Sequence, residues 1–255
     1  MQLSDITPLI LTRDEEANLE RTLAQLTWAD DVVMVDSHSN DATVEIARRF
    51  PNVRVLQREM DTLAEQSNFG LQHVKTPWVL LLDADYFVPA AFVDELRALE
   101  PPPGVRAYGG SFQYAINGKP LRASLYPARI VLLHREHATV WQDGHAHRVT
   151  VDGDVHMLST KLIHDDRKSF ARFIERQKRY MREEAEKLRH ADPRALSIPG
   201  RLRKFIVIAP IAVVVHTLFV KGLILDGGPG LRYTGERFVA ELILSRELLR
   251  SLFRQ

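Results

Sequence analysis

Two aspartates one residue apart, Asp83 and Asp85, follow an apolar run at Trp78–Leu82. A continuous apolar run is typical of a strand buried on both faces, and open α/β sheets bind ligands at the carboxyl ends of such strands. Carboxylate oxygens are hard ligands that suit Mg²⁺ or Mn²⁺ and the phosphates these ions carry. The same pattern also fits a strand followed by a solvated turn, so the pair by itself does not fix a function.

Another aspartate, Asp36, ends an earlier apolar segment and is followed by a polar turn that leads to Thr43. An aspartate at a strand end can accept hydrogen bonds from a ribose or a base, and a helix N-terminus favours phosphate. Helix capping explains Asp36 equally well. The chain has neither the G-x-G-x-x-G pattern of dinucleotide-binding folds nor the G-x-x-x-x-G-K-[ST] pattern of P-loops, which disfavours both classes.

Alternating strands and helices must position these carboxylates. The predicted strands are Ile6–Leu11, Asp31–Asp36, Val53–Leu56 and Pro77–Leu82. The predicted helices are Asp14–Leu26, Asp41–Phe50 (capped by Asn40 or Asp41) and Asp61–His73. This order predicts a parallel sheet with right-handed crossovers.

The pattern changes after Pro101–Gly104. We expect a hairpin around Asn117-Gly118, between Ala107–Ile116 and Leu121–Ser124. A charged helix at Arg167–Arg189, capped by Asp165 or Asp166, should follow. The remaining elements are an apolar segment at Phe205–Leu225, a turn at Asp226–Gly230 and a helix from about Glu236 to Phe253. The second half is therefore built differently from the first.

Four stretches of the first half belong together: Leu9–Glu16, Val35–Thr43, Gln66–Leu71 and Asp83–Asp85. Their order and spacing resemble those of family 2 glycosyltransferases, above all the hexose-adding enzymes of bacterial lipopolysaccharide core assembly. The resemblance implies an α/β GT-A fold, which is Rossmann-like, with a central, mostly parallel sheet flanked by helices and a helical C-terminal extension. It also implies a nucleotide diphosphate sugar, usually a UDP-sugar, as donor.

The resemblance assigns roles on the donor side. Thr12 and Glu15 would line the nucleoside pocket, and Asn68 would hold the wall of that pocket. Asp36 would meet the uracil or ribose. Asp83 would lie near the ribose and the metal, and Asp85 would ligate Mn²⁺ or Mg²⁺. A divalent ion would neutralise charge on the departing diphosphate. The chain departs from the family pattern at Asp14, often asparagine, and at Ser67, where many members have a basic residue beside the phosphates.

The second half must supply a base and the acceptor site. Inverting transfer needs a carboxylate that takes the proton of the acceptor hydroxyl, and Asp143, followed by Gly144, resembles the catalytic position of the family. Asp-Gly is also a turn dipeptide, so a hairpin remains an alternative. Arg129 could reach the diphosphate or the acceptor, or lie on the surface.

A histidine that follows the apolar stretch Leu158–Ile163 resembles the one that completes the metal shell in metal-dependent GT-A enzymes. This is His164. Helix capping by the aspartates that follow it is compatible with that role. His145 and His147 compete for the same position, and two histidines with this spacing could also bind zinc, although no third ligand has a suitable spacing.

Composition limits the other possibilities. The 255 residues include no cysteine, which excludes disulfides and thiolate metal sites. The first 166 residues hold 15 Lys/Arg and 24 Asp/Glu, whereas residues 167–255 hold 19 and 9. We expect the basic part to face anionic lipid or glycan, because it has little of the aromatic interleaving typical of nucleic-acid binding. The beginning of the chain lacks the features of a signal peptide, which favours a cytoplasmic protein.

The apolar segment Phe205–Leu225 has about the length of a bilayer span. Pro210, His216, Lys221 and Gly222 interrupt it. A spanning helix, a buried core helix and an interfacial helix remain open, and we favour a helix that docks on the inner face of the cytoplasmic membrane.

We therefore expect a catalytic domain at 1–166, with a nucleotide-sugar half at 1–100 and an acceptor and metal half at 101–166, followed by a basic helical region at 167–255. The expected function is inverting, metal-dependent transfer of a hexose to a glycan or lipid-linked acceptor in bacterial envelope polysaccharide or lipopolysaccharide synthesis. Two alternatives are a phosphohydrolase that uses Asp83 as nucleophile and Asp85 as acid, and a module that binds sugar nucleotide or a membrane partner without turnover.

Overall fold

The computed structural model describes every residue except 60, 144–145, 193, 195 and 253–255. The chain forms two compact units. The N-terminal unit comprises Met1–Asn117 and Tyr126–Arg167, and the C-terminal unit comprises Gly118–Leu125 and Lys168–Gln255. The functional division predicted after Asp166 stays a prediction.

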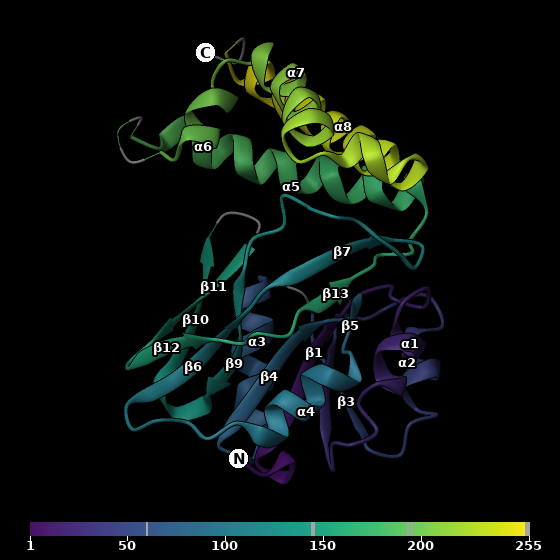
Figure 1. Ribbon diagram of the computed structural model, residues 1–255, viewed down its shortest axis with the longest axis vertical. Helices are drawn as coiled ribbons and strands as arrows, with labels where there is room; N and C mark the ends of the chain where they lie inside the picture. The colour runs from purple at the N-terminus through teal and green to yellow at the C-terminus, as the bar shows by residue number, and fades with distance from the viewer. Residues whose placement is uncertain (60, 144–145, 193, 195, 253–255) are drawn as a thin grey trace. The chain divides into compact units, whose positions relative to one another are not determined.

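A seven-stranded sheet forms the centre of the N-terminal unit (Figure 1). Its strands are β1 (Ile6–Thr12), β2 (Val32–Asp36), β3 (Val53–Gln57), β4 (Trp78–Asp83), β6 (Val105–Gly110), β9 (Arg129–His134) and β12 (Asp154–Met157), in the order β12-β6-β9-β4-β1-β2-β3. Strands β4, β1, β2 and β3 are parallel, and β9 runs antiparallel to both β4 and β6. The mostly parallel sheet is as predicted.

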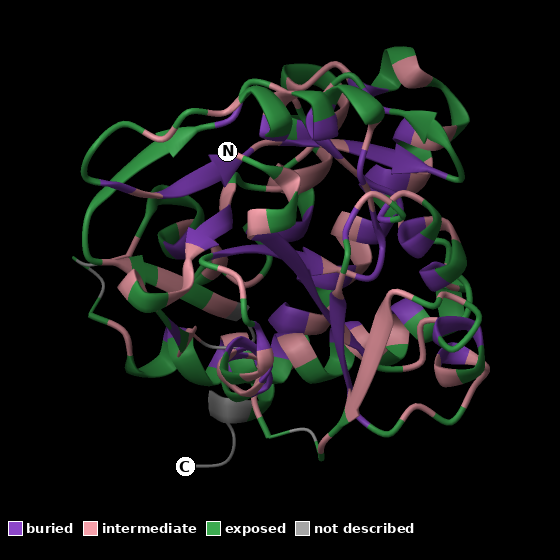
Figure 2. Ribbon diagram, turned by 90° about the horizontal axis from the view of Figure 1, so that it is seen from below, coloured by how far each residue is buried: buried purple, intermediate pink, exposed green. Residues whose placement is uncertain are grey.

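Helices cover both faces of this sheet because successive side chains of a strand point to opposite faces. In β1, Ile10 packs in the core that includes residues of α1 (Leu19–Ala24), α2 (Thr43–Ala47) and α4 (Ala90–Ala98), whereas Leu9 packs in a second core with residues of α3 (Leu63–His73). Figure 2 shows the central strands as mainly buried. Every strand predicted in the first hundred residues is present, to within a residue or two.

All three helices predicted in the first hundred residues begin later than expected, the third of them at Leu63 instead of Asp61. The first begins at Leu19 instead of Asp14, and the second at Thr43 instead of Asp41. The residues before the first two helices form the loops after β1 and β2. Side chains of each loop accept hydrogen bonds from backbone amides of the other. The proposed cap Asp41 does accept a hydrogen bond from the Thr43 amide (3.0 Å), although the structural N-cap position is Ala42.

Two smaller sheets complete the N-terminal unit. In one, β13 (Leu162–His164) pairs antiparallel with β5 (Tyr86–Phe87) and parallel with β7 (Phe112–Ile116). The other is a hairpin of β10 (Ala138–Asp143) and β11 (Ala146–Val151). Short 3₁₀ helices lie at Leu3–Asp5 and Arg135–His137. The first sheet pairs His164 with Tyr86, the residue directly after Asp85.

The turn at Asn117-Gly118 is present, and both residues have the positive φ (51° and 80°) that favours this dipeptide. The expectation of a strand at Leu121–Ser124 is wrong. The only strand after the turn and before Arg129, within the residues the structure describes, is β8 at Lys119–Pro120.

The C-terminal unit is helical. It contains α5 (Phe170–His190), α6 (Ile198–Arg203), α7 (Ile208–Val215), a π-helical turn (His216–Val220), a 3₁₀ helix (Leu223–Asp226) and α8 (Gly228–Leu252). Met181, Ala185 and Leu188 of α5 pack with Leu244 and Leu248 of α8. Among the described residues, no helix has both the length and the apolar character needed to cross a membrane.

Two predicted boundaries in this unit are wrong. The N-cap of α5 is Ser169, whose hydroxyl accepts from the Arg172 amide, and not Asp165 or Asp166. Helix α8 begins at Gly228, eight residues before the predicted Glu236, because a proline is tolerated in the first turn of a helix. Gly230 also has a packing role there, since a Cβ at this position would lie 1.9 Å from the Leu223 carbonyl oxygen.

Candidate active site

The register of the sheet brings three of the predicted site residues to one edge. Thr12 of β1 lies opposite Asp36 of β2, and Leu11 lies opposite Asp83 of β4. Strand β1 lies between β2 and β4. After β1 the chain adds β2 and β3 on one side of it and then returns to add β4 on the other side. The carboxyl ends of strands at such a switch point are the usual ligand site of an open α/β sheet.

Asp36 is completely buried, and its carboxylate forms hydrogen bonds with neighbouring residues of the chain. It accepts hydrogen bonds from the Thr12 hydroxyl (3.1 Å), the Ser39 amide (3.0 Å) and the Gln57 amide nitrogen (3.3 Å), and the Ser39 hydroxyl donates a further one. These bonds satisfy both oxygens. Asp36 and Thr12 thus hold the end of β2 and the loop after it.

The loops after β1 and β2 are joined by reciprocal hydrogen bonds. The Asp14 carboxylate accepts from the Asn40 amide (2.8 Å), and the Asp14 amide donates to the Ser39 hydroxyl (2.9 Å). The Glu15 amide likewise donates to the Thr43 hydroxyl (2.7 Å). Asp14 adopts a positive φ of 52°, which short polar residues tolerate better than most other non-glycine residues. These polar residues therefore have a structural role, and nucleoside binding by Thr12, Glu15 and Asp36 stays a prediction.

Asn68 and Ser67 lie on α3 and face different surroundings. The Asn68 side chain donates to the Val140 carbonyl of β10 (2.8 Å). The Ser67 hydroxyl donates to the Leu63 carbonyl (2.8 Å) inside its own helix, and the residue is fully buried. The predicted role of Asn68 in the nucleoside pocket stays a prediction.

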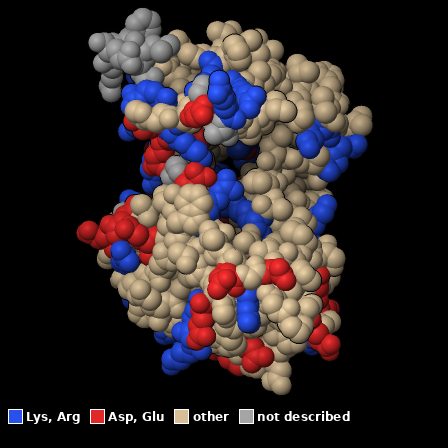
Figure 3. All heavy atoms as spheres, turned by 90° about the vertical axis from the view of Figure 1, so that its left-hand side faces the viewer, with Lys and Arg blue, Asp and Glu red and all other residues tan. Residues whose placement is uncertain are grey.

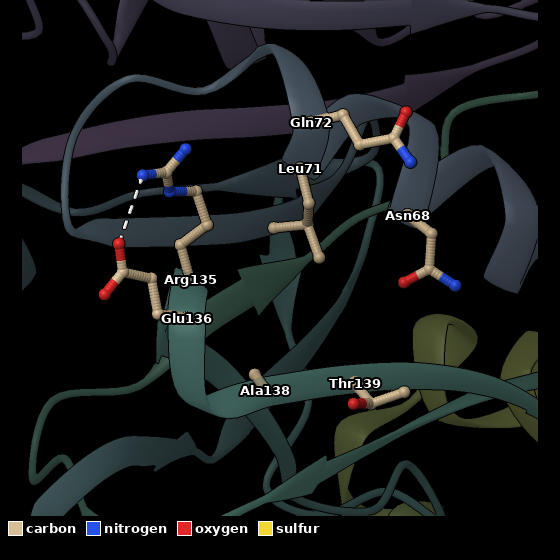
Figure 4. Close-up of a pocket in the computed structure, with 7 residues that line it drawn as sticks. All are labelled: Asn68, Leu71, Gln72, Arg135, Glu136, Ala138 and Thr139. Carbon is tan, nitrogen blue, oxygen red and sulfur yellow. Dashed lines mark ion pairs between the residues drawn. The ribbon is translucent and has the colours of Figure 1, made fainter.

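Asn68 also lines an open pocket of about 510 Å³ between α3 and the first part of β10. Figure 4 shows the side chains that surround it: Asn68, Leu71, Gln72, Arg135, Glu136, Ala138 and Thr139. Arg135 and Glu136 form an ion pair (3.6 Å) at its rim. This pocket contains none of the other predicted site residues.

Asp83 is paired with Arg129, for which the sequence left both a role at the diphosphate or acceptor and a surface position open. The Arg129 guanidinium lies 3.6 Å from the Asp83 carboxylate and 4.8 Å from the centre of the Tyr126 ring. Burial works against ionisation of Asp83, but the charges of Arg129 and His147 outweigh it, so the pKa of Asp83 lies below its ordinary value. Because its side chain is 37% exposed, Asp83 remains accessible to a ligand.

Asp85 and His164 meet in a buried aromatic setting. The His164 Nε2 atom lies 3.0 Å from an Asp85 carboxylate oxygen. The imidazole ring is surrounded by Tyr126 (4.4 Å between ring centres), Tyr114 (4.6 Å) and Tyr86 (5.5 Å). Burial and then the charge of Asp83 raise the pKa of Tyr86 and Tyr126 far above the usual value, so both hydroxyls stay protonated.

Two buried polar atoms at this pair have no hydrogen-bond partner among the described residues: Oδ1 of Asp85 and Nδ1 of His164. A buried polar atom without a partner is costly, and such atoms are found where an ion or ligand binds. A carboxylate and an imidazole are donors that suit Mn²⁺. Among the described residues, however, no three His, Asp or Glu side chains gather closely enough to hold an ion by themselves. The pair fits a metal that completes its coordination with substrate phosphates.

Helix α1 supports both metal-ligand candidates, a role that the sequence analysis missed. The Thr22 hydroxyl contacts the carbonyl oxygens of Ala84 (2.6 Å) and Tyr86 (2.9 Å), on either side of Asp85. The Arg21 guanidinium binds the carboxylate of Asp165 and its carbonyl oxygen (2.6 Å), directly after His164. Adjacent polar residues on an otherwise apolar helix were the only signal of this role.

Asn18, at the start of α1, reaches the same segment. Its side-chain amide donates to Asp166 (3.1 Å) and to Glu15 (3.0 Å), and its carbonyl oxygen accepts from the Arg167 amide (2.9 Å). Asp165 and Asp166 therefore anchor the segment after His164 to α1.

Asp143 ends β10, and it is the residue opposite Ala146 in the hairpin. Its carboxylate is half-buried and pairs with the Arg148 side chain (3.1 Å). The hairpin alternative is thus present, and it is compatible with a role as base, which stays a prediction. Gly144 and His145, the latter a candidate for the metal role, lie outside the described residues.

His147, on the other strand of the hairpin, lies within electrostatic range of the Asp83–Arg129 pair. Burial lowers its pKa, the Asp83 charge opposes this effect, and the Arg129 charge adds to it. The lowered pKa favours the neutral form of this imidazole. Since Asp83 and His147 influence each other, the hairpin that carries Asp143 faces the same part of the sheet edge.

Comparison with known proteins agrees with this arrangement. Residues 9–122 match the model of the Glycosyl transferase family 2. An uncharacterized glycosyltransferase of Rickettsia bellii (strain RML369-C) is 33% identical over 93 residues, which is 36% of this chain and 31% of that protein. One of Rickettsia typhi is 30% identical over 96 residues. The matched region spans about a third of the length of these relatives.

Among solved structures, mannosyl-3-phosphoglycerate synthase from Rubrobacter xylanophilus has a TM-score of 0.50 and 15% identity, with 76% of each chain covered. Glucosyl-3-phosphoglycerate synthase from Mycobacterium tuberculosis, in complex with Mn²⁺, UDP and phosphoglyceric acid, has a TM-score of 0.47 and 15% identity over 72% of this chain and 77% of that chain. The fold is the α/β GT-A fold, with a mostly parallel sheet flanked by helices and helices at the C-terminal side.

Proposed function

We propose that this chain, whose residues 9–122 match the model of the Glycosyl transferase family 2, transfers a hexose from a nucleotide diphosphate sugar to a glycan or glycolipid acceptor with inversion at the anomeric carbon. A UDP-sugar is the expected donor. The observation that supports this best is the buried Asp85–His164 pair, with a polar atom of each residue unpartnered among the described residues, beside Asp83 at the sheet edge.

The proposed cofactor is Mn²⁺ or Mg²⁺, held by Asp85 and His164 together with the donor diphosphate. When bound, the ion would neutralise charge that develops on the departing diphosphate. Arg129 adds a permanent positive charge, which its position between Asp83 and the Tyr126 ring keeps in place. Asp83 would accept hydrogen bonds from the ribose, while Thr12, Glu15, Asp36 and Asn68 would shape the nucleoside pocket.

Asp143 is the proposed base. The acceptor oxygen forms a bond to the anomeric carbon as the bond from that carbon to the diphosphate oxygen breaks, and the hydroxyl proton moves to the Asp143 carboxylate. The position of Asp143 at the end of β10 supports this role, because His147 of the paired strand lies within electrostatic range of Asp83.

The proposed setting is bacterial envelope polysaccharide or lipopolysaccharide synthesis, with a lipid-linked acceptor at the inner face of the cytoplasmic membrane. The excess of ten positive charges in residues 167–255 supports it, because anionic lipid attracts such a region. Donor, acceptor and membrane would then be the partners of the protein, without nucleic acid.

Calorimetric titration with UDP, with and without Mn²⁺, tests the donor site. We expect Mn²⁺-dependent binding by the wild type and its loss in Asp85→Ala. Asp94→Ala is a matched control, since Asp94 lies on the surface of α4 and pairs only with Arg97 among the residues the structure describes. If neither UDP nor another nucleoside diphosphate binds in Mn²⁺, the proposal is wrong.

Turnover separates an enzyme from a binding module. The wild type should release UDP slowly from a UDP-sugar, by hydrolysis or transfer, while Asp143→Asn should bind the donor normally and release none. Donor binding without turnover in the wild type would favour the module. Phosphate release from a simple phosphoester, without any nucleotide requirement, would favour the phosphohydrolase.

A further inference from the structure

Large apolar side chains point outward from the segment between α6 and α8 in the C-terminal unit. Nine of them have exposed fractions from 48% to 75%: Phe205, Val207, Ile208, Ile211, Val215, Phe219, Val220, Ile224 and Leu225. Soluble proteins rarely expose so many large apolar residues in one short segment. This segment therefore exposes apolar surface to water, and contact with an apolar partner would remove that exposure.

The outward direction is fixed by the opposite side of the same helix. Ala209 and Thr217 are buried, and the Thr217 hydroxyl donates to the Val213 carbonyl (2.7 Å) and contacts the Thr234 hydroxyl of α8 (3.1 Å). Small and polar residues thus face the core of this unit. Surface helices normally bury their apolar stripe, and here the arrangement is reversed.

Four of the exposed residues form a stripe that we call the apolar stripe: Ile208, Ile211, Val215 and Phe219. Their spacing of three, four and four residues places them next to one another along α7 and the π-helical turn. The stripe can thus contact one continuous apolar surface.

Positive charge accompanies the stripe. Residues 198–225 include four basic residues and no acidic one. Arg203 is neutralised by Glu184 and Glu241, but the exposed Arg201 and Lys204 contact only backbone carbonyls among the residues that the structure describes. In the view of Figure 3, charged side chains of the C-terminal unit are mostly blue and lie beside broad uncharged surface.

We propose that the apolar stripe docks on the surface of an anionic bilayer, with its side chains below the headgroups and Arg201 and Lys204 at the lipid phosphates. Helices that combine an apolar face with basic residues lie in the membrane interface in this way. Only the idea that the acceptor comes from this membrane rests on the proposed function. Binding of the stripe to lipid does not depend on any catalytic activity.

The basic residues favour lipid over a second copy of this chain. In a symmetric dimer the same patch meets itself, so Arg201 and Lys204 would approach their own copies. Anionic headgroups would instead attract them. The surface therefore matches a negatively charged apolar partner better than a positively charged one.

Vesicle flotation of the full chain tests the proposal, with vesicles of phosphatidylcholine alone and of equal parts phosphatidylcholine and phosphatidylglycerol. We expect the wild type to float with the anionic vesicles and to dissociate at high salt. The variant Ile208→Ser/Ile211→Ser/Phe219→Ser should bind them at least roughly tenfold more weakly. The control Val155→Ser/Met157→Ser, at exposed apolar positions of β12, should bind like the wild type.

A charge variant examines the other half of the proposal. Arg201→Gln/Lys204→Gln should lose the preference for anionic over neutral vesicles while it keeps the melting temperature of the wild type. UDP titration of every variant separates this proposal from the previous one. Vesicle binding without any nucleotide binding would contradict only the proposed function.

Two results would overturn the proposal. One is a wild type that stays free of anionic vesicles at low salt. The other is a concentration-dependent dimer in light scattering that the triple serine variant abolishes, together with equal vesicle binding by the two proteins, because the stripe would then belong to a second copy.

Discussion

Two regions of the candidate site use their polar side chains in opposite ways. Around β1 and β2, the Asp36 carboxylate accepts from Thr12, Ser39 and Gln57, so the protein satisfies its own groups. Around β4 and β13, one polar atom each of Asp85 and His164 is buried without a partner among the described residues. The hydrogen bonds of the first region hold its own loops in place, whereas the second region has the unpartnered polar atoms that we expect at a ligand site.

This difference separates stability from binding. A buried group that is fully bonded stabilises the fold, and its loss leaves several donors unpaired. A buried carboxylate with an unpartnered oxygen destabilises the fold until a cation binds. Substitutions at β2 should therefore reduce the free energy of unfolding, whereas those at Asp85 should reduce ligand affinity and turnover.

The largest effect is expected for Asp85→Asn. The change keeps the shape of the side chain but removes the charge that attracts a divalent ion, so the transfer rate should fall by about 10²–10³-fold. The free energy of unfolding without metal should stay the same or rise, because a neutral amide is less costly to bury. Rate measurements and denaturant unfolding of the metal-free protein check both statements.

A matched result comes from thermal unfolding with added Mn²⁺ and UDP. The wild type should gain stability from these ligands, since binding to the folded state stabilises it, and Asp85→Asn should gain much less. An Asp85→Asn protein that unfolds far more easily than the wild type without ligands would show that Asp85 is structural, and the contrast between the two regions would fail.

The next effect is expected for Asp36→Asn. The new amide nitrogen would point its hydrogens at groups that donate, such as the Ser39 amide or the Thr12 hydroxyl, so the free energy of unfolding should fall by about 2–4 kcal/mol. Urea unfolding measures it. Asp31→Asn is the control, because its pair with Arg54 (2.8 Å) is partly exposed and should contribute at most about 1 kcal/mol.

The contrast between these regions also explains what the sequence could reveal. Apolar periodicity located the strands because each one is buried, and Asp83 and Asp85 were visible as carboxylates directly after such a run. Periodicity cannot tell whether a polar residue before a helix binds its own helix or another loop. Asp14 binds the loop after β2 and Asp165 binds Arg21, so α1 begins late and α5 is capped by Ser169.

The support from α1 could not be predicted for a different reason. Thr22 contacts residues about sixty positions away, and Arg21 contacts a residue more than a hundred positions away. Such contacts depend on how the sheet and its crossovers place α1, and local sequence patterns contain no information about them. The candidate metal ligands were identifiable by residue type, but the residues that support them could be found only from the fold.

Thr22→Val tests this support. The valine keeps the shape but removes the hydroxyl that contacts the Ala84 and Tyr86 carbonyls, so the free energy of unfolding should fall by about 1–3 kcal/mol. Residues that orient a metal ligand typically affect metal affinity by about 10–100-fold, and we expect a Mn²⁺ affinity in the presence of UDP near the lower end of that range.

Thr22→Ser is the control because it keeps the hydroxyl, and it should retain most of the Mn²⁺ affinity. Equal affinities in the valine and serine variants would mean that the hydroxyl does not position Asp85. A loss of stability alone, with unchanged Mn²⁺ affinity, would mean that Thr22 stabilises the fold, as the residues around β1 and β2 do, and does not position Asp85.

The smallest effect is expected at the segment that leads into β13. The Glu95 carboxylate of α4 accepts from the Ser159 amide (2.7 Å), the Ser159 hydroxyl (2.7 Å) and the Thr160 amide (2.8 Å). Burial works against ionisation, but these bonds outweigh it, so the pKa of Glu95 is lowered. Glu95→Gln keeps one acceptor and should cost about 0.5–1.5 kcal/mol at pH 7.

The pH dependence of Glu95→Gln identifies the cause. Because the folded pKa of Glu95 lies below the unfolded value, the carboxylate contributes its full stability above the unfolded pKa and loses it as the pH falls through the folded pKa. The difference between wild type and variant in urea unfolding should therefore be constant from neutral pH down to mild acid and then shrink. A difference that persists unchanged in strong acid would mean that Glu95 acts through packing, and that the segment before His164 needs no ionised carboxylate to hold it.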